Sequence, residues 1–187
     1  NYGGYRLMTL NSIYVDNLIK TALLEDINYL DTTTDYLIDE NQENTAIFLA
    51  KSSGVLCGIE VALRVFEILQ PKVYKHDGDK LVKGEIIAEI HGKTRTILKG
   101  ERTALNLIQH MSGIATATNK AVEIVSGTKA SIADTRKTLP GMRPLRSEAE
   151  EITVTIFQMP QCSRITTLTQ AAELPTLFQS LNQNSVI

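Results

Sequence analysis

Residues 133–143 have the sequence ADTRKTLPGMR, and the interpretation of the whole chain depends on this stretch. The segment 129–133 predicts a short buried strand. Arg136 and Lys137 follow that strand, and a Pro-Gly pair then predicts a turn. Ligands of α/β sheets and barrels lie at the carboxyl ends of strands, so the two cations are candidates for binding a carboxylate or a phosphate. For an isolated Arg-Lys pair, a solvated strand end would be the better interpretation.

Length and composition limit the class of protein. The chain has 187 residues, 43% of them hydrophobic, which allows one large domain or two small ones. A net charge of -2 gives no basic field for nucleic acid, so an anionic ligand needs a local cluster of cations. Cys57 and Cys162 predict neither a disulfide scaffold nor a zinc site, and we expect a cytoplasmic protein. The sequence predicts no membrane span and no signal peptide.

The first half of the chain predicts helices packed against an antiparallel sheet, an α+β arrangement. A helix capped by Ser12 is expected to end at 24–26, before a polar loop at 31–35. A second helix is expected to run from Gly58 to Pro71. Strands are expected at 45–50, 55–57, 72–75 and 86–90, and at 94–98, which we expect to pair with 86–90.

A second informative stretch is 100–118, GERTALNLIQHMSGIATAT. It predicts a helix that starts at Gly100, a break of small residues at 112–113, and a further helix that ends at 126–127. In that assignment Arg102 lies in the first helical turn, where the helix dipole favours anions. We therefore expect Arg102 to have an anionic ligand or an acidic neighbour.

These two stretches closely resemble motifs of the quinolinate phosphoribosyltransferase family, and the resemblance extends over about 10–143. It implies an N-terminal α+β domain at 1–112, followed at 113–146 by the start of an α/β barrel that is incomplete in this chain. The acids at 25–26 and the segment 31–35 resemble a further family segment, although a glycine usual in the family is replaced here. Residues 147–187 resemble nothing in the family.

The resemblance also implies an activity. Enzymes of this family use quinolinate, phosphoribosyl pyrophosphate and Mg²⁺, release pyrophosphate and CO₂, and leave nicotinate mononucleotide. Quinolinate is a dicarboxylate, and the corresponding cations here are Arg102, Arg136 and Lys137. The family's equivalent of Arg102 reaches into the active site of the other subunit, which implies a homodimer or a larger homo-oligomer. Three weaker candidates are Thr135, Thr138 and Arg143.

Two other functions remain open at this point. A nicotinate or nicotinamide phosphoribosyltransferase is the nearest enzyme, with a substrate that carries fewer charges. The segment 77–85 also resembles the turns of biotinyl and lipoyl carrier domains. A carrier needs an acceptor lysine at an exposed hairpin tip, flanked by small residues or Met, and no lysine has that setting.

The composition changes sharply near residue 146. All eleven glycines and all eleven lysines lie at or before Gly141 and Lys137, and 146–187 contains neither. Synonymous codons for 148–154, regrouped by one base, encode Gly-Gly-Gly-Asn-His-Arg, and those for 158–169 encode a Lys-Asp-Asn-His segment. Both are motifs that the family has and this chain lacks. We therefore expect a frameshifted, poorly ordered tail at 147–187, without the family's Mg²⁺ ligands, and a catalytically inactive chain; a divergent tail is the alternative.

Overall fold

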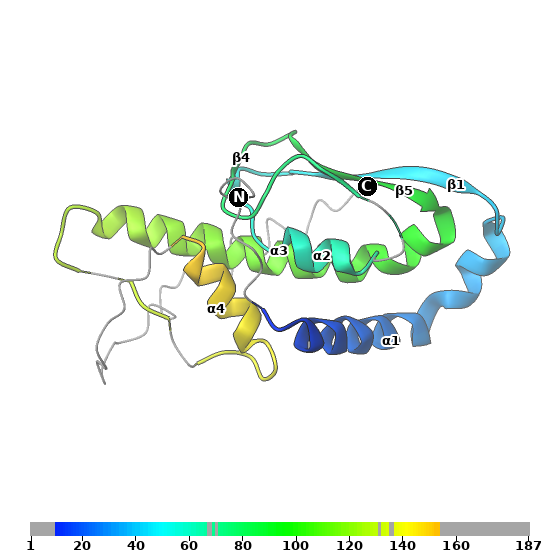
Figure 1. The fold of residues 1–187 in the computed structure, drawn as a ribbon, viewed down its shortest axis with the longest axis horizontal. Coiled ribbons are helices and arrows are strands. Elements are labelled where there is room, and N and C mark those ends of the chain that lie inside the picture. The colour runs from blue at the N-terminus through cyan, green and yellow to red at the C-terminus, as the bar shows by residue number, and fades with distance from the viewer. Residues whose placement is uncertain (1–9, 67–68, 70, 131, 135–136, 154–187) are drawn as a thin grey trace.

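The computed structural model describes residues 10–66, 69, 71–130, 132–134 and 137–153, with only the backbone for 27–34. A long helix, α3 (Thr94–Val125), runs through the middle of the molecule (Figure 1). The strands lie on one side of α3, and α1 (Ser12–Leu37) and α4 (Arg143–Glu151) lie on the other. The short helix α2 (Ile59–Arg64) packs against α3 and contributes to the cores on both sides. The long helix thus separates two hydrophobic cores.

The strands form two small antiparallel sheets, in agreement with the predicted mixture of helices and antiparallel strands. In the larger sheet β5 (Ile86–Lys93) lies between β1 (Glu43–Leu49) and β3 (Lys72–Val73). The smaller sheet pairs β2 (Gly54–Val55) with β4 (Lys80–Leu81). No closed barrel is present among the described residues.

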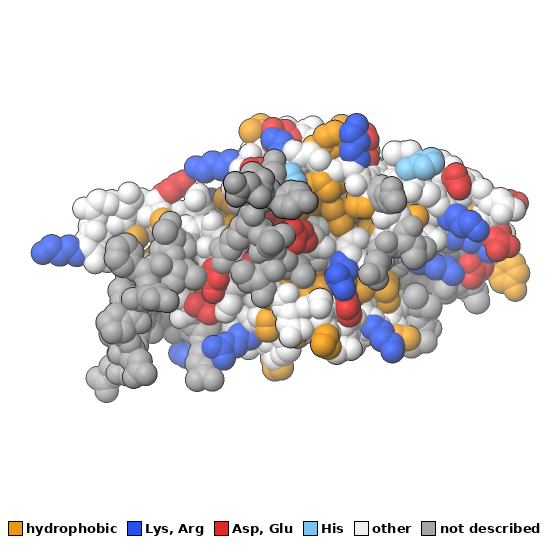
Figure 2. All heavy atoms as spheres, in the orientation of Figure 1, with side chains coloured by type: hydrophobic (Ala, Val, Ile, Leu, Met, Phe, Trp, Pro, Cys, Tyr) orange, Lys and Arg blue, Asp and Glu red, His pale blue; other side chains and the backbone are white. Residues whose placement is uncertain are grey.

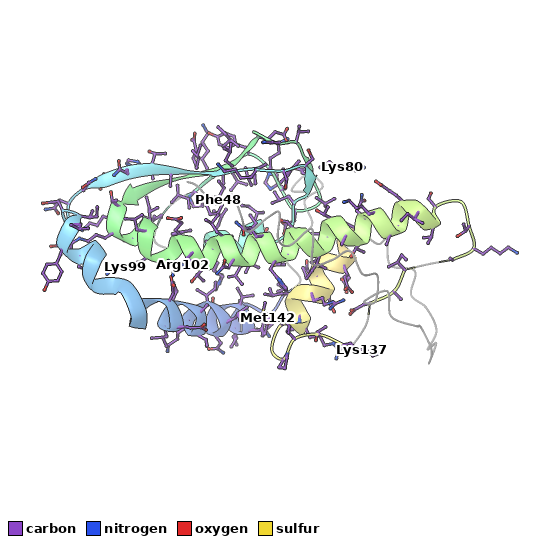
Figure 3. The ribbon with its side chains drawn as sticks, turned by 180° about the vertical axis from the view of Figure 1, so that it is seen from behind. Phe48, Lys80, Lys99, Arg102, Lys137 and Met142 are labelled. Carbon is purple, nitrogen blue, oxygen red and sulfur yellow. The ribbon has the colours of Figure 1, made fainter. Side chains whose placement is uncertain are left out.

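The first core lies between the larger sheet, α2 and α3. Phe48 points from β1 toward α3 and makes an edge-to-face contact with Phe66, with 6.4 Å between the ring centroids (Figure 3). Gly100 allows α3 to approach this core closely, because a Cβ at that position would lie 2.5 Å from the Phe66 ring. The close approach fixes the position of α3 against the sheet.

The second core joins α1, α3 and α4. Its fully buried members include Val15 of α1, Met111 of α3, and Leu145 and Ala149 of α4. Gly58 adopts a left-handed backbone just before α2, and a Cβ there would lie 2.6 Å from the Met111 sulfur. Apolar burial on this side of α3 therefore holds both α1 and α4 in place.

The helix α1 differs from its prediction at both ends. Its N-terminal cap is Asn11, whose Oδ1 accepts hydrogen bonds from the backbone N–H groups of Ile13 and Tyr14 at 2.9 and 3.4 Å, so the expected Ser12 cap is wrong. The helix also continues to Leu37, through the positions expected to form a polar loop. Its last turn is stabilised by Arg95, which the sequence around α1 does not reveal.

The helix α3 also differs from its prediction. It begins at Thr94, so the strand expected at 94–98 is wrong, and it continues through the break expected at 112–113. Ser112 is part of the helix because its hydroxyl serves the neighbouring chain: it accepts from the Cys57 N–H and donates to the Cys57 carbonyl, both at 3.0 Å. The Ser112 hydroxyl thus attaches the backbone at Cys57 to α3.

Beyond α3 the described chain contains no further strand. Of the strand expected at 129–133, residues 129, 130, 132 and 133 are described, and none is in a strand. A parallel strand needs neighbours to pair with, and the described residues supply none. Residues 147–151 belong to α4, in contrast to the poor order expected from 147 onward; 154–187 lie outside the described residues. In the described part of the chain, no helix is long and apolar enough to cross a membrane.

Candidate functional site

The turn predicted at Pro140 and Gly141 is present and is attached to α1. Gly141 has a φ of +80°, which favours glycine, and the Met142 N–H donates to the Leu139 carbonyl at 3.0 Å. The Tyr14 hydroxyl donates a hydrogen bond to the Gly141 carbonyl, and partial burial raises the pKa of this hydroxyl. The turn that follows the two candidate cations is therefore held on the first turn of α1.

Lys137 lies on the surface just before this turn. Its side chain is exposed, and its backbone carbonyl accepts a hydrogen bond from Arg146 of α4 at 3.3 Å. Thr138 is half-buried, and Arg143 is exposed at the first position of α4. The two other candidates, Thr135 and Arg136, lie outside the described residues.

Asp134, which precedes Lys137 in the same loop, is attached to a side chain of α4. Ser147 donates a hydrogen bond to the carboxylate of Asp134, and Arg146 pairs with Glu150 at 2.8 Å. Burial and the neighbouring Asp134 carboxyl raise the pKa of Glu150 from 4.5 to about 7, although Arg146 opposes the shift. Sequence reasoning missed these contacts, which hold the loop that carries Lys137 against α4.

Arg102 lies on α3, on the side that faces α1. It is eight residues after Thr94, about two turns into the helix, so the expected conflict with the N-terminal dipole does not arise. The expectation of an acidic neighbour is confirmed: Arg102 Nη1 donates to Asp26 Oδ1 at 2.9 Å. The Arg102 side chain is 60% exposed.

Arg102 and Lys137 do not meet within one chain. Figure 3 places Arg102 between α3 and α1, and Lys137 far along the molecule, on the loop below α4. Met142 lies between these two labels, where α4 begins beside the start of α1. The structure therefore does not bring Arg102 and Lys137 into one site of a single chain.

No broad basic surface covers the face in Figure 2, where blue and red side chains are interspersed. Acidic and basic side chains lie next to each other where α1 ends and α3 begins. Within the described ranges no group of three or more His, Cys, Asp or Glu side chains is placed to hold a metal ion. These residues do not fit a Mg²⁺ site, and we assign no chemical step to one.

Comparison with known families identifies the chain. The model of the quinolinate phosphoribosyl transferase N-terminal domain matches residues 31–112, and the model of the C-terminal domain of the same family matches 114–154. The chain belongs to the quinolinate phosphoribosyltransferase family. The resemblance found in the two motifs is therefore confirmed, and the segment 77–85 lies within the N-terminal domain of this family instead of a carrier domain.

Curated members of the family align with most of this chain. A Bacillus subtilis (strain 168) protein named as a probable carboxylating nicotinate-nucleotide pyrophosphorylase is 42% identical over 144 residues, which are 75% of this chain and 50% of that protein. The carboxylating nicotinate-nucleotide pyrophosphorylase of Mycobacterium leprae is 41% identical over 141 residues, 72% of this chain and 50% of that one. The chain thus spans about half the length of these quinolinate phosphoribosyltransferase relatives.

Solved structures agree with this family assignment. NadC from Streptococcus pyogenes superimposes with a TM-score of 0.73 at 34% identity, covering 78% of this chain and 54% of that one. The nicotinate-nucleotide pyrophosphorylase from Ehrlichia chaffeensis gives a TM-score of 0.71 at 28% identity, covering 95% of this chain and 68% of that one. The fold described above is therefore that of a quinolinate phosphoribosyltransferase through the described residues.

Proposed function

We propose that this chain supplies the dicarboxylate-binding cations of an enzyme that transfers a phosphoribosyl group to quinolinate. The observation that carries the proposal is the family match over both domains, together with two exposed cations, Arg102 and Lys137, at the motif positions. Quinolinate, phosphoribosyl pyrophosphate, nicotinate mononucleotide, pyrophosphate and CO₂ are the substrates and products of the proposed reaction. The cytoplasmic location expected from the sequence remains a prediction.

The chemistry of the reaction explains why cations are needed. Arg102, Arg136 and Lys137 hold the two carboxylates, with the planar guanidinium groups suited to paired hydrogen bonds and lysine to a point charge. Cleavage at the anomeric carbon gives the ribose cationic character and leaves negative charge on the departing pyrophosphate, which neighbouring cations stabilise. Thr135, Thr138 and Arg143 remain weaker candidates for support of the loop or the ligand.

We further propose that Arg102 acts in the site of a neighbouring subunit. The separation of Arg102 and Lys137 in Figure 3 supports this arrangement, since one chain does not bring the two cations together. An interface of obligate size is expected, because the partner must hold a long side chain in register with the site. Mixing an Arg102→Ala protein with an Arg136→Ala protein, both on a full-length background, should restore part of the activity. No complementation would place Arg102 in the site of its own subunit.

The substrate can be tested with a chimaera. Residues 1–145 of this chain are joined to the second half of the Bacillus subtilis relative, and pyrophosphate release is measured with quinolinate, nicotinate and nicotinamide in parallel. We expect turnover with quinolinate alone, because three convergent cations match two carboxylates. A preference for nicotinate would replace the proposed function with that of a nicotinate phosphoribosyltransferase.

The chain as written is proposed to be inactive by itself. The metal-binding acids expected of the family have no counterpart that the sequence identifies in 146–187. Mg²⁺ therefore remains an expectation from the family, with no residue of this chain assigned to it. Sequencing the locus tests the frameshift: a restored frame should encode the Asn-His-Arg and Lys-Asp-Asn-His motifs. An uninterrupted frame for the present tail in independent reads would contradict it.

A further inference from the structure

A basic stripe on α3 faces α1. Arg95, Lys99 and Arg102 follow each other at spacings of four and three residues, which places them on one side of the helix (Figure 3 labels the last two). All three contact α1: Arg95 and Lys99 meet Asp35, and Arg102 meets Asp26. We call this row of contacts the α1–α3 seam.

Asp26 occupies a position of α1 that normally faces a partner helix. Val15 and Ile19 are buried against α3 and α4, and Asp26 follows Ile19 by seven residues, which returns it to the same side of α1. Only 24% of its side chain is exposed, compared with 60% for Arg102. The acid is therefore the anchored member of this pair, and the guanidinium extends beyond it toward solvent.

Among the residues whose side chains the structure describes, the contact with Asp26 leaves most of the Arg102 guanidinium available. A guanidinium has five N–H donors. In the described part of the chain, Asp26 is the one hydrogen-bond partner of this group, through Nη1. A single hydrogen bond to a partly buried carboxylate restricts the rotation of the side chain without occupying the donors that a ligand needs.

We propose that Asp26 is a positioning residue for Arg102: its carboxylate orients the guanidinium so that the remaining donors are presented to a planar dicarboxylate. The inference rests on the proposed function, because it concerns the same ligand. An arginine side chain loses rotamer entropy when it is fixed, and a partner that fixes it before the ligand arrives removes part of that cost from binding.

Charge and orientation predict opposite effects when Asp26 is neutralised. The Asp26 carboxylate repels a dianionic ligand, so its removal strengthens binding if charge alone matters. If orientation matters more, removal weakens binding although the site becomes more positive. The sign of the change in affinity therefore separates a positioning residue from an acid that merely neutralises Arg102.

The test compares Asp26→Asn with Asp35→Asn in the full 187-residue chain. Asp35 is the matched control, because it serves Arg95 and Lys99 on the same seam. Equilibrium titration with quinolinate gives the affinity, and ¹⁵N NMR of the arginine side chains gives the rotation rate of the Arg102 guanidinium. Thermal unfolding of both variants checks that the fold is unchanged.

We expect Asp26→Asn to weaken quinolinate binding by about five- to tenfold and to speed rotation of the Arg102 guanidinium, whereas Asp35→Asn leaves both unchanged. Asp26→Glu, which keeps the carboxylate, should recover part of the affinity. Equal or tighter binding by Asp26→Asn, with the unsubstituted chain binding normally, overturns the positioning role and leaves the proposed function intact. No binding by the unsubstituted chain overturns the proposed function, and this inference with it.

Discussion

Arg95 and Arg102 lie seven residues apart on the same side of α3, and both contact α1, yet their surroundings differ. Arg95 donates hydrogen bonds to the Asp35 and Ile38 carbonyls at 2.6 to 2.8 Å, and 28% of its side chain is exposed. Arg102 donates one hydrogen bond to Asp26 and is 60% exposed. The difference indicates that Arg95 completes the fold, and it supports the proposal that Arg102 binds a ligand.

A cation at the end of a helix explains the role of Arg95. The last carbonyls of α1 have no partner within the helix, and Arg95 satisfies them where the helix dipole is negative. Asp26 of α1, by contrast, lies well before the last turn, so Arg102 satisfies no helix end. Position along α1 thus decides which arginine is structural.

The largest expected effect on stability concerns Glu150, an acid of α4 that is mostly buried. The raised pKa of Glu150 means that this carboxyl is protonated in the folded protein from its ordinary pKa of 4.5 up to about 7. Its contribution to stability is present below pH 4.5 and is lost as the pH rises through about 7, because the buried carboxyl must then ionise; the cost is about 3 kcal/mol. Glu150→Gln should remove this pH dependence.

Urea unfolding at pH 4.5 and pH 8 measures the effect of Glu150→Gln. The variant should match the parent at the lower pH and exceed it at the higher pH. If the parent gains stability relative to the variant as the pH rises, the carboxylate of Glu150 is stabilised by Arg146 more than it is destabilised by burial, and the interpretation of this acid is wrong.

The second effect tests whether Arg95 stabilises the end of α1. Arg95→Ala should lower the free energy of unfolding by about 1–2 kcal/mol, because the carbonyls at the end of α1 lose their charged donor. Lys99→Ala is the matched control, since Lys99 meets the exposed carboxylate of Asp35 and should cost less than about 1 kcal/mol. Equal losses in urea unfolding would remove the distinction between a helix cap and a surface ion pair.

The third effect is smaller and depends on salt. Asp35→Asn removes the acid that Arg95 and Lys99 share and should cost at most about 1 kcal/mol at low ionic strength. Because the groups are partly exposed, the loss should shrink further in 1 M NaCl, where the Debye length is about 3 Å. A loss that is independent of salt would show that Asp35 acts through packing.

The sequence patterns correctly predicted those strands and turns whose conformation depends on residues close by in the chain. The alternation at 86–90, the apolar run at 45–50 and the Pro140-Gly141 turn all appear in the structure. In each case the residues that determine the conformation lie within a few positions of the element itself. The roles that the family motifs assign to Arg102 and Lys137 stay predictions, and the structure places both side chains on the surface.

Contacts between distant residues explain what the sequence did not predict. The extension of α1 depends on Arg95, which lies 57 residues after Ile38, and the continuity of α3 through Ser112 depends on Cys57, 55 residues earlier. Asp26 was predicted to end a helix, whereas its partner Arg102 lies 76 residues later. A helix predicted to begin at Thr94 would have placed Arg95, Lys99 and Arg102 on one face. That basic face would have indicated a partner helix that carries acids, such as α1.

The most direct test of the account is the effect of Arg102→Ala on two quantities in the same full chain, the free energy of unfolding and the affinity for quinolinate. We expect the free energy of unfolding to change by less than about 1 kcal/mol, because the Arg102 side chain is 60% exposed and its ion pair is screened by solvent. The affinity should fall by about tenfold to a hundredfold, because hydrogen bonds between ions are lost. A large loss of stability with unchanged affinity would make Arg102 structural like Arg95 and contradict the account.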